Sequence, residues 1–503
     1  MTHPVRIELQ PLGKTIEVEA GTPLQDVLFA QGVEFPCGGR GRCRGCRIKV
    51  VAGNLPATPE DERVFAPGEL ADGWRLACRG QASGDLTIEL AQWEAAILAD
   101  HTSVAGFKPR IGWGAAVDLG TTTIVAQLLD LATGHVLGVR MAWNEQARHG
   151  ADIMSRVEYA QSEAGLRTLR DLVRQQIGGM LSELCHSAAI EDQSLESVVL
   201  VGNTVMHHLF CGVDVSPLAH TPFEPLDDGL KSFHGRELGW PCTEVHFLPC
   251  LGGFVGSDIL AGILATRMHQ ALNLHALVDL GTNGEIVIGN RDGLFCGSTA
   301  AGPAFEGARI SMGMRAATGA ISEVSLEKGH VRCHVLGGAE PRGICGSGLV
   351  DAIAVGLDLG WIKPSGRLAR GESIALAGAV QITQADIREL QLAKAAIAAG
   401  IRILAARRQV AVTDIASAHL AGAFGNYINR SSARRIGLFD FPLDKVEAAG
   451  NTALLGAKIA LLNLREFDLS FTEPLRLTRH VSLSEDLDFQ DIYATEMAFP
   501  PPR

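Results

Sequence analysis

Apolar and polar residues alternate in the first segment of the chain. RIELQPLGKTIEVEAG alternates on both sides of Pro11–Lys14, which predicts a β-hairpin. TPLQDVLFAQG repeats its apolar residues at helical spacing, which predicts a short helix with Thr22 as a candidate N-cap. CRIKVVAG and LTIEL are predicted to form further strands. Together these elements predict a β-grasp domain over residues 1–92.

The pattern changes after this first domain. Residues 93–112 have no sustained periodicity and end in a Gly/Lys/Pro stretch, which predicts a linker. WGAAVDLGTTTIVAQLLDLATG then predicts two apolar strands joined by a tight turn, and ALVDLGTNGEIVIGN repeats this arrangement about 160 residues later. Two copies of a strand–DLGT–strand unit indicate an internal duplication. We therefore expect an α/β domain over residues 113–503, made of two half-domains with a cleft between them.

Two later segments have helical periodicity. ITQADIRELQLAKAAIAAGIRIL, residues 382–404, predicts a long helix capped by Thr383. NTALLGAKIALL, near the end of the chain, predicts another helix.

The composition is that of a globular protein. The 503 residues are 47% apolar and 20% charged, and the net charge is −12. An acidic chain is a poor partner for the phosphates of nucleic acid. No apolar run approaches the roughly eighteen residues of a membrane span, and MTHPVRIELQ lacks the apolar core of a signal peptide. We therefore expect a cytoplasmic protein, in which clustered cysteines are metal ligands rather than disulfides.

Three cysteines lie close together in PCGGRGRCRGC, with the spacing C-x5-C-x2-C, and Cys78 follows in RLACRG. Four thiolates suit a [2Fe–2S] cluster, because each iron takes two cysteines and the glycines let backbone N–H groups turn toward the sulfides. A structural zinc ribbon is the alternative, but such ribbons usually show two C-x2-C pairs. The spacing resembles the adrenodoxin-like branch of the [2Fe–2S] ferredoxins. The first domain is therefore expected to carry single electrons.

The tips of the two DLGT hairpins have residues suited to phosphate binding. Glycine and threonine present N–H and hydroxyl groups to phosphate oxygens without a bulky side chain in the way. The carboxylates of Asp118 and Asp279, which lead the two tips, are suited to holding hydrated Mg²⁺ or to orienting an attacking water. Two hairpins facing across a cleft resemble the RNase H-like superfamily of acetate and sugar kinases, heat-shock chaperone ATPases and actin. HLAGAFGNYINR resembles the adenosine motif of that superfamily, so ATP binding is implied.

The order of the motifs resembles a narrower family. A [2Fe–2S] domain followed by DLGTTT, GNTVM, DLGTNGE, AGPAFEG, GICGSGL and AGAFGNY resembles the reductive activators of corrinoid proteins. The resemblance implies ATP-dependent transfer of one electron to the Co(II) corrinoid protein of a methyltransferase system, which regenerates Co(I). It also implies a homodimer formed through the ATPase domain, and an electron donor that the sequence does not name.

The resemblance assigns site residues by position. The cluster ligands would be Cys37, Cys43, Cys46 and Cys78. The first phosphate hairpin would comprise Asp118, Gly120, Thr121, Thr122 and Thr123. The second would comprise Asp279, Gly281, Thr282, Asn283, Gly284 and Glu285, and the adenosine would pack on Gly422 and Gly425. Asp118 is expected to organise Mg²⁺, and either Asp279 or Glu285 is expected to orient the attacking water.

Two other functions fit the same motifs. A small-molecule kinase with a fused redox-sensing ferredoxin domain would phosphorylate a metabolite without any corrinoid partner. A nucleotide-binding redox-signalling protein would bind ATP without turning it over. Activators of radical dehydratases place a [4Fe–4S] cluster between subunits with cysteines inside the kinase-like fold, and that arrangement is not evident in this sequence.

Overall fold

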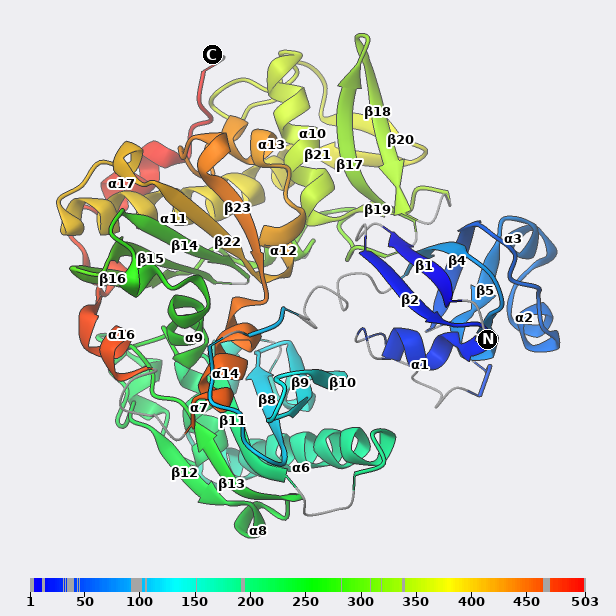
Figure 1. Cartoon of the computed structure of the whole chain (residues 1–503). Helices are drawn as coiled ribbons and strands as arrows, with labels where there is room; N and C mark the ends of the chain where they lie inside the picture. Colours follow the sequence, from blue (N-terminus) through cyan, green and yellow to red (C-terminus); the bar gives the residue numbers. More distant parts are fainter. Residues whose placement is uncertain are drawn as a thin grey trace.

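The computed structural model arranges the chain around one five-stranded and two six-stranded sheets (Figure 1). It describes all residues except 1–3, 11–13, 30, 32, 34–39, 43, 45, 92–101, 105, 151, 191–194, 282, 308, 318, 337–339, 465–470, 502 and 503. Among the helices of the described residues, none is both long enough and apolar enough to cross a membrane.

The first region is a β-grasp domain, as the alternating pattern predicts. Its sheet has the order β2-β1-β7-β4-β5, in which β1 and β2 form the predicted antiparallel hairpin and β7 pairs parallel to β1. The strands are β1 (Pro4–Gln10), β2 (Lys14–Glu19), β4 (Arg47–Ala52), β5 (Trp74–Leu76) and β7 (Leu86–Leu90). The helix α1 (Leu24–Phe29) buries Leu24, Val27 and Leu28 against this sheet's core.

The prediction that Thr22 caps this helix is wrong. α1 begins at Leu24, and Thr22 lies in β3 (Thr22–Pro23), which pairs with β6 (Gln81–Ala82). The Thr22 hydroxyl donates a hydrogen bond to the carbonyl oxygen of Glu19 at 2.7 Å. Thr22 therefore does not cap α1, because it forms a strand pair with a distant segment.

The large domain contains the predicted duplication. In the first half-domain the sheet order is β10-β9-β8-β11-β13-β12, and in the second it is β23-β22-β14-β15-β16-β24. Each half begins with three antiparallel strands and then adds two parallel strands on the far side of the first one. This shared strand order is typical of the duplicated RNase H-like fold.

The bounds of these strands follow the apolar runs of the sequence. The first sheet contains β8 (Trp113–Leu119), β9 (Thr123–Asp130), β10 (Val136–Trp143), β11 (Leu195–Gly202), β12 (Lys231–His234) and β13 (Cys242–Phe247). The second contains β14 (His275–Leu280), β15 (Gly284–Asn290), β16 (Gly293–Thr299), β22 (Ser417–Ala421), β23 (Val446–Gly450) and β24 (Thr478–His480).

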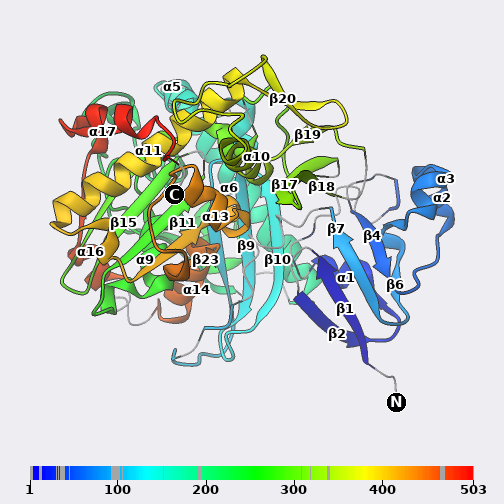
Figure 2. The same cartoon turned by 90° about the horizontal axis from the view of Figure 1, so that it is seen from above.

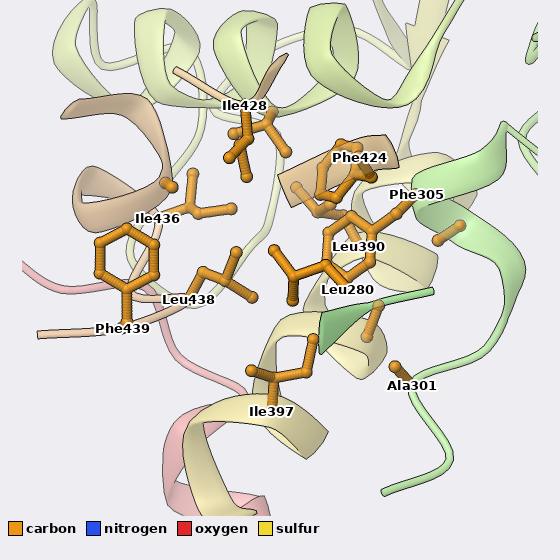
Figure 3. Close-up of a cluster of buried hydrophobic side chains, with 14 of the residues drawn as sticks. Leu280, Ala301, Phe305, Leu390, Ile397, Phe424, Ile428, Ile436, Leu438 and Phe439 are labelled. Atoms are coloured by element: carbon orange, nitrogen blue, oxygen red, sulfur yellow. The ribbon is translucent and has the colours of Figure 1, made fainter. Parts of the chain in front are cut away.

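Helices cover both sheets. The first sheet is covered by α6 (Glu163–Ser187) and α7 (Thr204–Cys211), and the second sheet is covered by α11 (Gln384–Arg408). Thr383 caps α11 as predicted, because its hydroxyl accepts a hydrogen bond from the backbone N–H of Asp386. Figure 3 shows part of the second core, where Leu390 and Ile397 of α11 meet Leu280 at the end of β14. This packing fixes the base of the second DLGT hairpin.

Two helices join the half-domains at the cleft. α9 (Ser257–Thr266) lies between the sheets, with Leu260 in an apolar cluster against the first sheet and Ile263 in an apolar cluster against the second. α14 (Thr452–Leu462), the second predicted helix, crosses it so closely that a Cβ on Gly456 would approach the carbonyl oxygen of Ala261 to 2.0 Å. A glycine is required at this crossing, and it brings the N-termini of both helices to the same cleft.

The β-grasp domain lies against the large domain (Figure 2). α1 contacts β10, and the apolar core of the β-grasp domain continues into Ala320, Leu336 and Cys345 of the large domain. Ala320 begins β17 (Ala320–Glu327), which pairs with β18 (His330–Val335) and β19 (Gly343–Ile344). The two domains therefore share one apolar contact surface.

Candidate functional site

The two DLGT hairpins face each other across one cavity. Its volume is about 420 Å³, and its lining includes Asp118 and Thr121–Thr123 from the first hairpin and Asp279 from the second. Gly281, Asn283 and Glu285 line the same cavity, whereas Gly284 is buried in β15 and Thr282 lies outside the described residues. The structure thus brings together most of the residues that the sequence assigned to phosphate binding.

The first hairpin is held by side chains of two other loops. The Gly120 N–H donates to the Thr123 carbonyl at 3.1 Å, which closes the tip. The Asn203 amide donates to the Thr121 hydroxyl at 2.9 Å, and the Asn144 amide donates to the Gly120 carbonyl at 2.9 Å. These contacts fix the tip without using the hydroxyl groups of Thr122 and Thr123.

The second hairpin repeats this closure. The Gly281 N–H donates to the Asn283 carbonyl at 3.1 Å. Asp279 and Glu285 are directly opposed residues of the antiparallel strands β14 and β15, so their side chains lie on the same face of the sheet. Both face the cavity, and the Ser298 hydroxyl donates to the Glu285 carboxylate at 3.3 Å.

Asp258 is a further carboxylate that lines the cavity, as are Asp152 and Glu306, and sequence reasoning missed it. Asp258 lies in the first turn of α9 and lines the cavity with Asp118, Asp279 and Glu285. Its only sequence signal is an acidic residue at a helix start after a Gly-Ser pair. Asn451, the N-cap of α14, was also missed, and its amide donates to the Asp118 carboxylate at 2.9 Å.

Burial raises the pKa of Asp118, Asp258, Asp279 and Glu285, and neighbouring carboxylates raise the pKa of the last three further. Burial raises the pKa of Asp118 to about 6, against the opposing effect of the Asn451 hydrogen bond. Burial and the charge of Asp118 raise the pKa of Asp279 to about 7. Burial and the charges of Asp118 and Asp279 raise the pKa of Asp258 to about 8. Burial and the charges of Asp258 and Asp279 raise the pKa of Glu285 well above its usual range. A cation beside these carboxylates would favour their ionised forms.

The chemistry of this cavity fits a divalent cation. Among the described residues that line it, none is lysine or arginine, so no side chain there neutralises the acids. Carboxylate oxygens are the ligands that Mg²⁺ prefers, and Mg²⁺ commonly combines one or two of them with water and substrate phosphates. Asp118, Asp258 and Asp279 line the cavity, but among the described residues no three acidic, histidine or cysteine side chains lie close enough to bind one ion directly, so an ion here would be held largely through water.

A smaller cavity of about 220 Å³ adjoins the first and shares Asp279, Gly281 and Gly422 with it. Gly422 has φ = 78°, and a Cβ there would approach an Asp279 carboxylate oxygen to 2.6 Å. Gly425 instead packs against Leu420 of β22 and does not line either cavity. The apolar walls come from Phe305 and Phe424, whose rings stack with centroids 4.7 Å apart (Figure 3), and from Tyr427. A flat, largely apolar group such as a nucleobase fits these walls.

The described part of the cysteine site brings Cys46 and Cys78 together. A hydrogen bond from the Cys46 thiol, with lesser help from the Gly41 N–H and the Arg79 charge, lowers the pKa of Cys78 to about 7 against the effect of burial. A thiol of lowered pKa beside a second thiol, with a backbone N–H directed at its sulfur, fits an iron–sulfur cluster. The other two predicted ligands, Cys37 and Cys43, lie outside the described residues.

Comparison with known families divides the chain into three matching regions. Residues 7–83 match the 2Fe-2S iron-sulfur cluster binding domain family. Residues 113–271 match the family described as the RACo middle region, and residues 273–503 match the C-terminal domain of RACo, described as the ASKHA domain.

Individual relatives extend over most of the chain. The corrinoid activation enzyme RamQ of Eubacterium limosum is 35% identical over 423 residues, which are 77% of this chain and 70% of RamQ. The [Co(II) methylated amine-specific corrinoid protein] reductase of Methanosarcina barkeri is 26% identical and aligns over 77% of each chain. A solved structure titled reductive activator for corrinoid, iron-sulfur protein superposes with a TM-score of 0.69 at 28% identity, covering 99% of this chain and 98% of that chain.

Proposed function

The chain belongs to the family of reductive activators of corrinoid proteins, and from this premise we propose that it uses ATP to drive one electron onto a Co(II) corrinoid protein. The product is the Co(I) corrinoid that a methyltransferase system needs for methyl transfer. The observation that carries the ATP-dependent part is the pair of DLGT hairpins facing one acidic cavity. The redox part is supported by the contact between Cys46 and Cys78 in a domain that matches the 2Fe-2S family.

The nucleotide site follows from the lining of the two cavities. Asp118, Asp258 and Asp279 hold hydrated Mg²⁺, and the Thr121–Thr123 tip binds phosphate oxygens through N–H and hydroxyl groups. The adenosine lies over Gly422, between the walls that include Phe424 and Tyr427. The attacking water is oriented by Asp279 or Glu285, which share one face of the β14–β15 hairpin.

The cysteine site provides the electron. When bound by Cys37, Cys43, Cys46 and Cys78, a [2Fe–2S] cluster supplies one electron at a time, at a potential near −400 mV for plant-type clusters. The chain's own residues exclude water from the site, because Cys46 and Cys78 are buried. A separate one-electron donor restores the reduced state after each transfer.

ATP is needed because the transfer runs uphill. In a one-electron step, each 59 mV by which the acceptor lies below the donor disfavours the product tenfold, or about 1.4 kcal/mol. Nucleotide binding and hydrolysis shift this balance if they favour a complex in which the corrinoid is easier to reduce. The shared apolar surface between the two domains supports such coupling, because a movement of the β-grasp domain would change its contacts with Ala320, Leu336 and Cys345 of the large domain.

Two further features belong to the same proposal. The domain division is 1–92 for the cluster domain, 93–112 for the linker and 113–503 for the ATPase domain. Two copies of the chain associate through the ATPase domain, which light scattering on the purified protein would detect as a doubled mass.

One experiment tests the function. The protein, reduced with dithionite, is mixed with a Co(II) corrinoid protein, and the visible spectrum is followed with and without MgATP. Co(I) absorbance that appears only with MgATP supports the proposal, and a non-hydrolysable ATP analogue should give at most one turnover per protein. Equal reduction without nucleotide contradicts it. ATP-dependent phosphorylation of a metabolite without cobalt reduction would identify the kinase alternative instead.

A further inference from the structure

The cavities that receive the nucleotide in the proposed function contain many acids and almost no positive charge. Among the described residues that line either cavity, the one lysine or arginine is Arg315. It lines the smaller cavity, close to Thr122 and Thr123 of the first hairpin, which line both. A nucleoside triphosphate brings several negative charges into this space, and Mg²⁺ neutralises only part of them. Arg315 is therefore the side chain placed to neutralise the remainder.

Arg315 is engaged elsewhere in the structure. Its guanidinium carbon lies 3.9 Å from the centroid of the Trp143 ring, in a cation–π contact. Trp143 ends β10 in the first half-domain and remains 53% exposed, whereas Arg315 belongs to the second half-domain. The contact therefore joins the two half-domains at the mouth of the cleft. An exposed cation–π contact is weaker than a charge-assisted hydrogen bond to phosphate, so phosphate can displace the ring.

We propose that Arg315 is a nucleotide-binding residue that leaves Trp143 and binds the polyphosphate when the nucleotide enters the cleft. This proposal rests on the proposed nucleotide site and adds a residue to it. Guanidinium groups bind phosphate oxygens in a bidentate way that lysine cannot reproduce. The ligand class recognised by Arg315 is thus the anionic phosphate chain rather than the nucleoside.

The residues on either side of Arg315 lie at the apolar contact surface with the β-grasp domain. Met314 and Ala316 pack against the apolar cluster that joins the β-grasp core to Ala320 and Cys345. Arg315 therefore lies in a segment that touches the interdomain contact, next to the domain that carries the cysteines.

The test measures binding of MgATP and of adenosine to the full-length, cluster-loaded protein by calorimetry. Arg315→Gln is expected to weaken MgATP binding by about 10- to 100-fold, the range for a hydrogen bond to a charged group, and to leave adenosine binding within about threefold. Arg315→Lys should retain part of the ATP affinity. The matched control is Arg332→Gln, because Arg332 is an exposed arginine on β18 that lines neither cavity.

Tryptophan emission gives a second readout. MgATP should change the emission of the wild-type protein and of Arg332→Gln, and this change should be absent from Trp143→Phe and Arg315→Gln. Unchanged ATP affinity in Arg315→Gln overturns the assignment, as does an equal loss for ATP and adenosine in a variant with wild-type thermal stability. If the wild-type protein binds no MgATP, the proposed function fails together with this inference. If the wild type binds MgATP and Arg315→Gln matches it, only the role of Arg315 fails.

Discussion

The side-chain amide of Asn451 donates a hydrogen bond to the carboxylate of Asp118 at 2.9 Å, across the cleft between the two half-domains. The same side chain caps α14, because its oxygen accepts the backbone N–H of Leu454 at 2.9 Å. Since the cap occupies the oxygen, the amide nitrogen is directed at Asp118. One residue thus connects the start of a helix to the carboxylate expected to organise Mg²⁺.

Replacing Asn451 with serine should separate these two roles. Serine is an equally good N-cap, so α14 should keep the cap whose loss would cost about 1 kcal/mol. The lost amide donor favoured the ionised form of Asp118, whose pKa is about 6, so its pKa should rise further. The acidic limb of the ATPase pH profile should therefore move to higher pH.

The control is Asn429→Ser, which changes the N-cap of α13 (Arg430–Arg435), away from both cavities. Its pH profile should match that of the wild type. An unchanged acidic limb in Asn451→Ser would show that Asp118 does not need to be ionised for hydrolysis.

Without Mg²⁺, the folded protein should lose stability as the pH rises. The pKa values of Asp118, Asp279 and Asp258 are raised to about 6, 7 and 8. Between about pH 4, the ordinary range of an aspartate, and pH 8, the folded state therefore binds more protons than the unfolded chain. The contribution of these groups to stability is present at low pH and is lost as the pH rises through their folded pKa values. Thermal melts in a chelator should show this decline, and added Mg²⁺ should reduce it.

The matched variant is Asp258→Asn, which removes the aspartate with the highest pKa of these three. It should melt higher than the wild type at pH 8 in chelator, and the difference should disappear near pH 4. Its ATPase activity should fall about 100-fold, as for the loss of one preorganised electrostatic group. A variant that shows the wild-type pH dependence and full activity would remove Asp258 from the site.

The parts of the site that the sequence predicted are local in the chain. DLGTTT and DLGTNGE each place a carboxylate, a turn and phosphate-binding groups within a few residues, so both hairpins were identifiable without a structure. Asp258 and Asn451 belong to helix starts that reach the cleft only because α9 and α14 cross at Gly456. No local pattern distinguishes such a residue from an ordinary first-turn acid or N-cap.

The error at Thr22 has the same origin. Thr22 looks like a cap locally, but it pairs with β6, a segment some sixty residues away. Gly425 sits in the motif assigned to adenosine, yet only Gly422 of that pair lines a cavity. For Thr22, the neighbour that decides the residue's role comes from a distant part of the sequence.

Gly422→Ala should disable hydrolysis through a steric contact with a carboxylate. The new Cβ would lie 2.6 Å from an Asp279 oxygen, at a φ of 78° that already disfavours alanine. Displacing a reacting group by about 1 Å can lower a rate about 100-fold, and a loss of that order is expected in kcat. Steady-state ATPase kinetics measure it.

Gly371→Ala is the matched control for backbone strain. Gly371 has φ = 69°, but its nearest atom to a new Cβ is 3.9 Å away and it lines neither cavity. Both variants should lose a similar amount of stability, and only Gly422→Ala should lose activity. Equal ATPase rates in the two would mean that Asp279 tolerates displacement and does not act in hydrolysis.

Cys78→Ser should remove the redox function and leave the ATPase intact, because the two sites use different residues. Cys78 contacts Cys46 in the β-grasp domain, whereas the acids that surround the nucleotide belong to the large domain. The variant should lose the visible absorbance and the electron paramagnetic resonance signal of a reduced cluster while hydrolysing ATP at the wild-type rate. Cys333→Ser, at a half-buried thiol on β18, should retain both properties. Asp118→Ala should show the opposite pattern, with cluster absorbance retained and hydrolysis lost. If Cys78→Ser also abolished hydrolysis in a protein of wild-type stability, ATP hydrolysis would depend on the cluster. The cluster would then control the ATPase, whereas the proposal has the ATPase controlling electron transfer from the cluster.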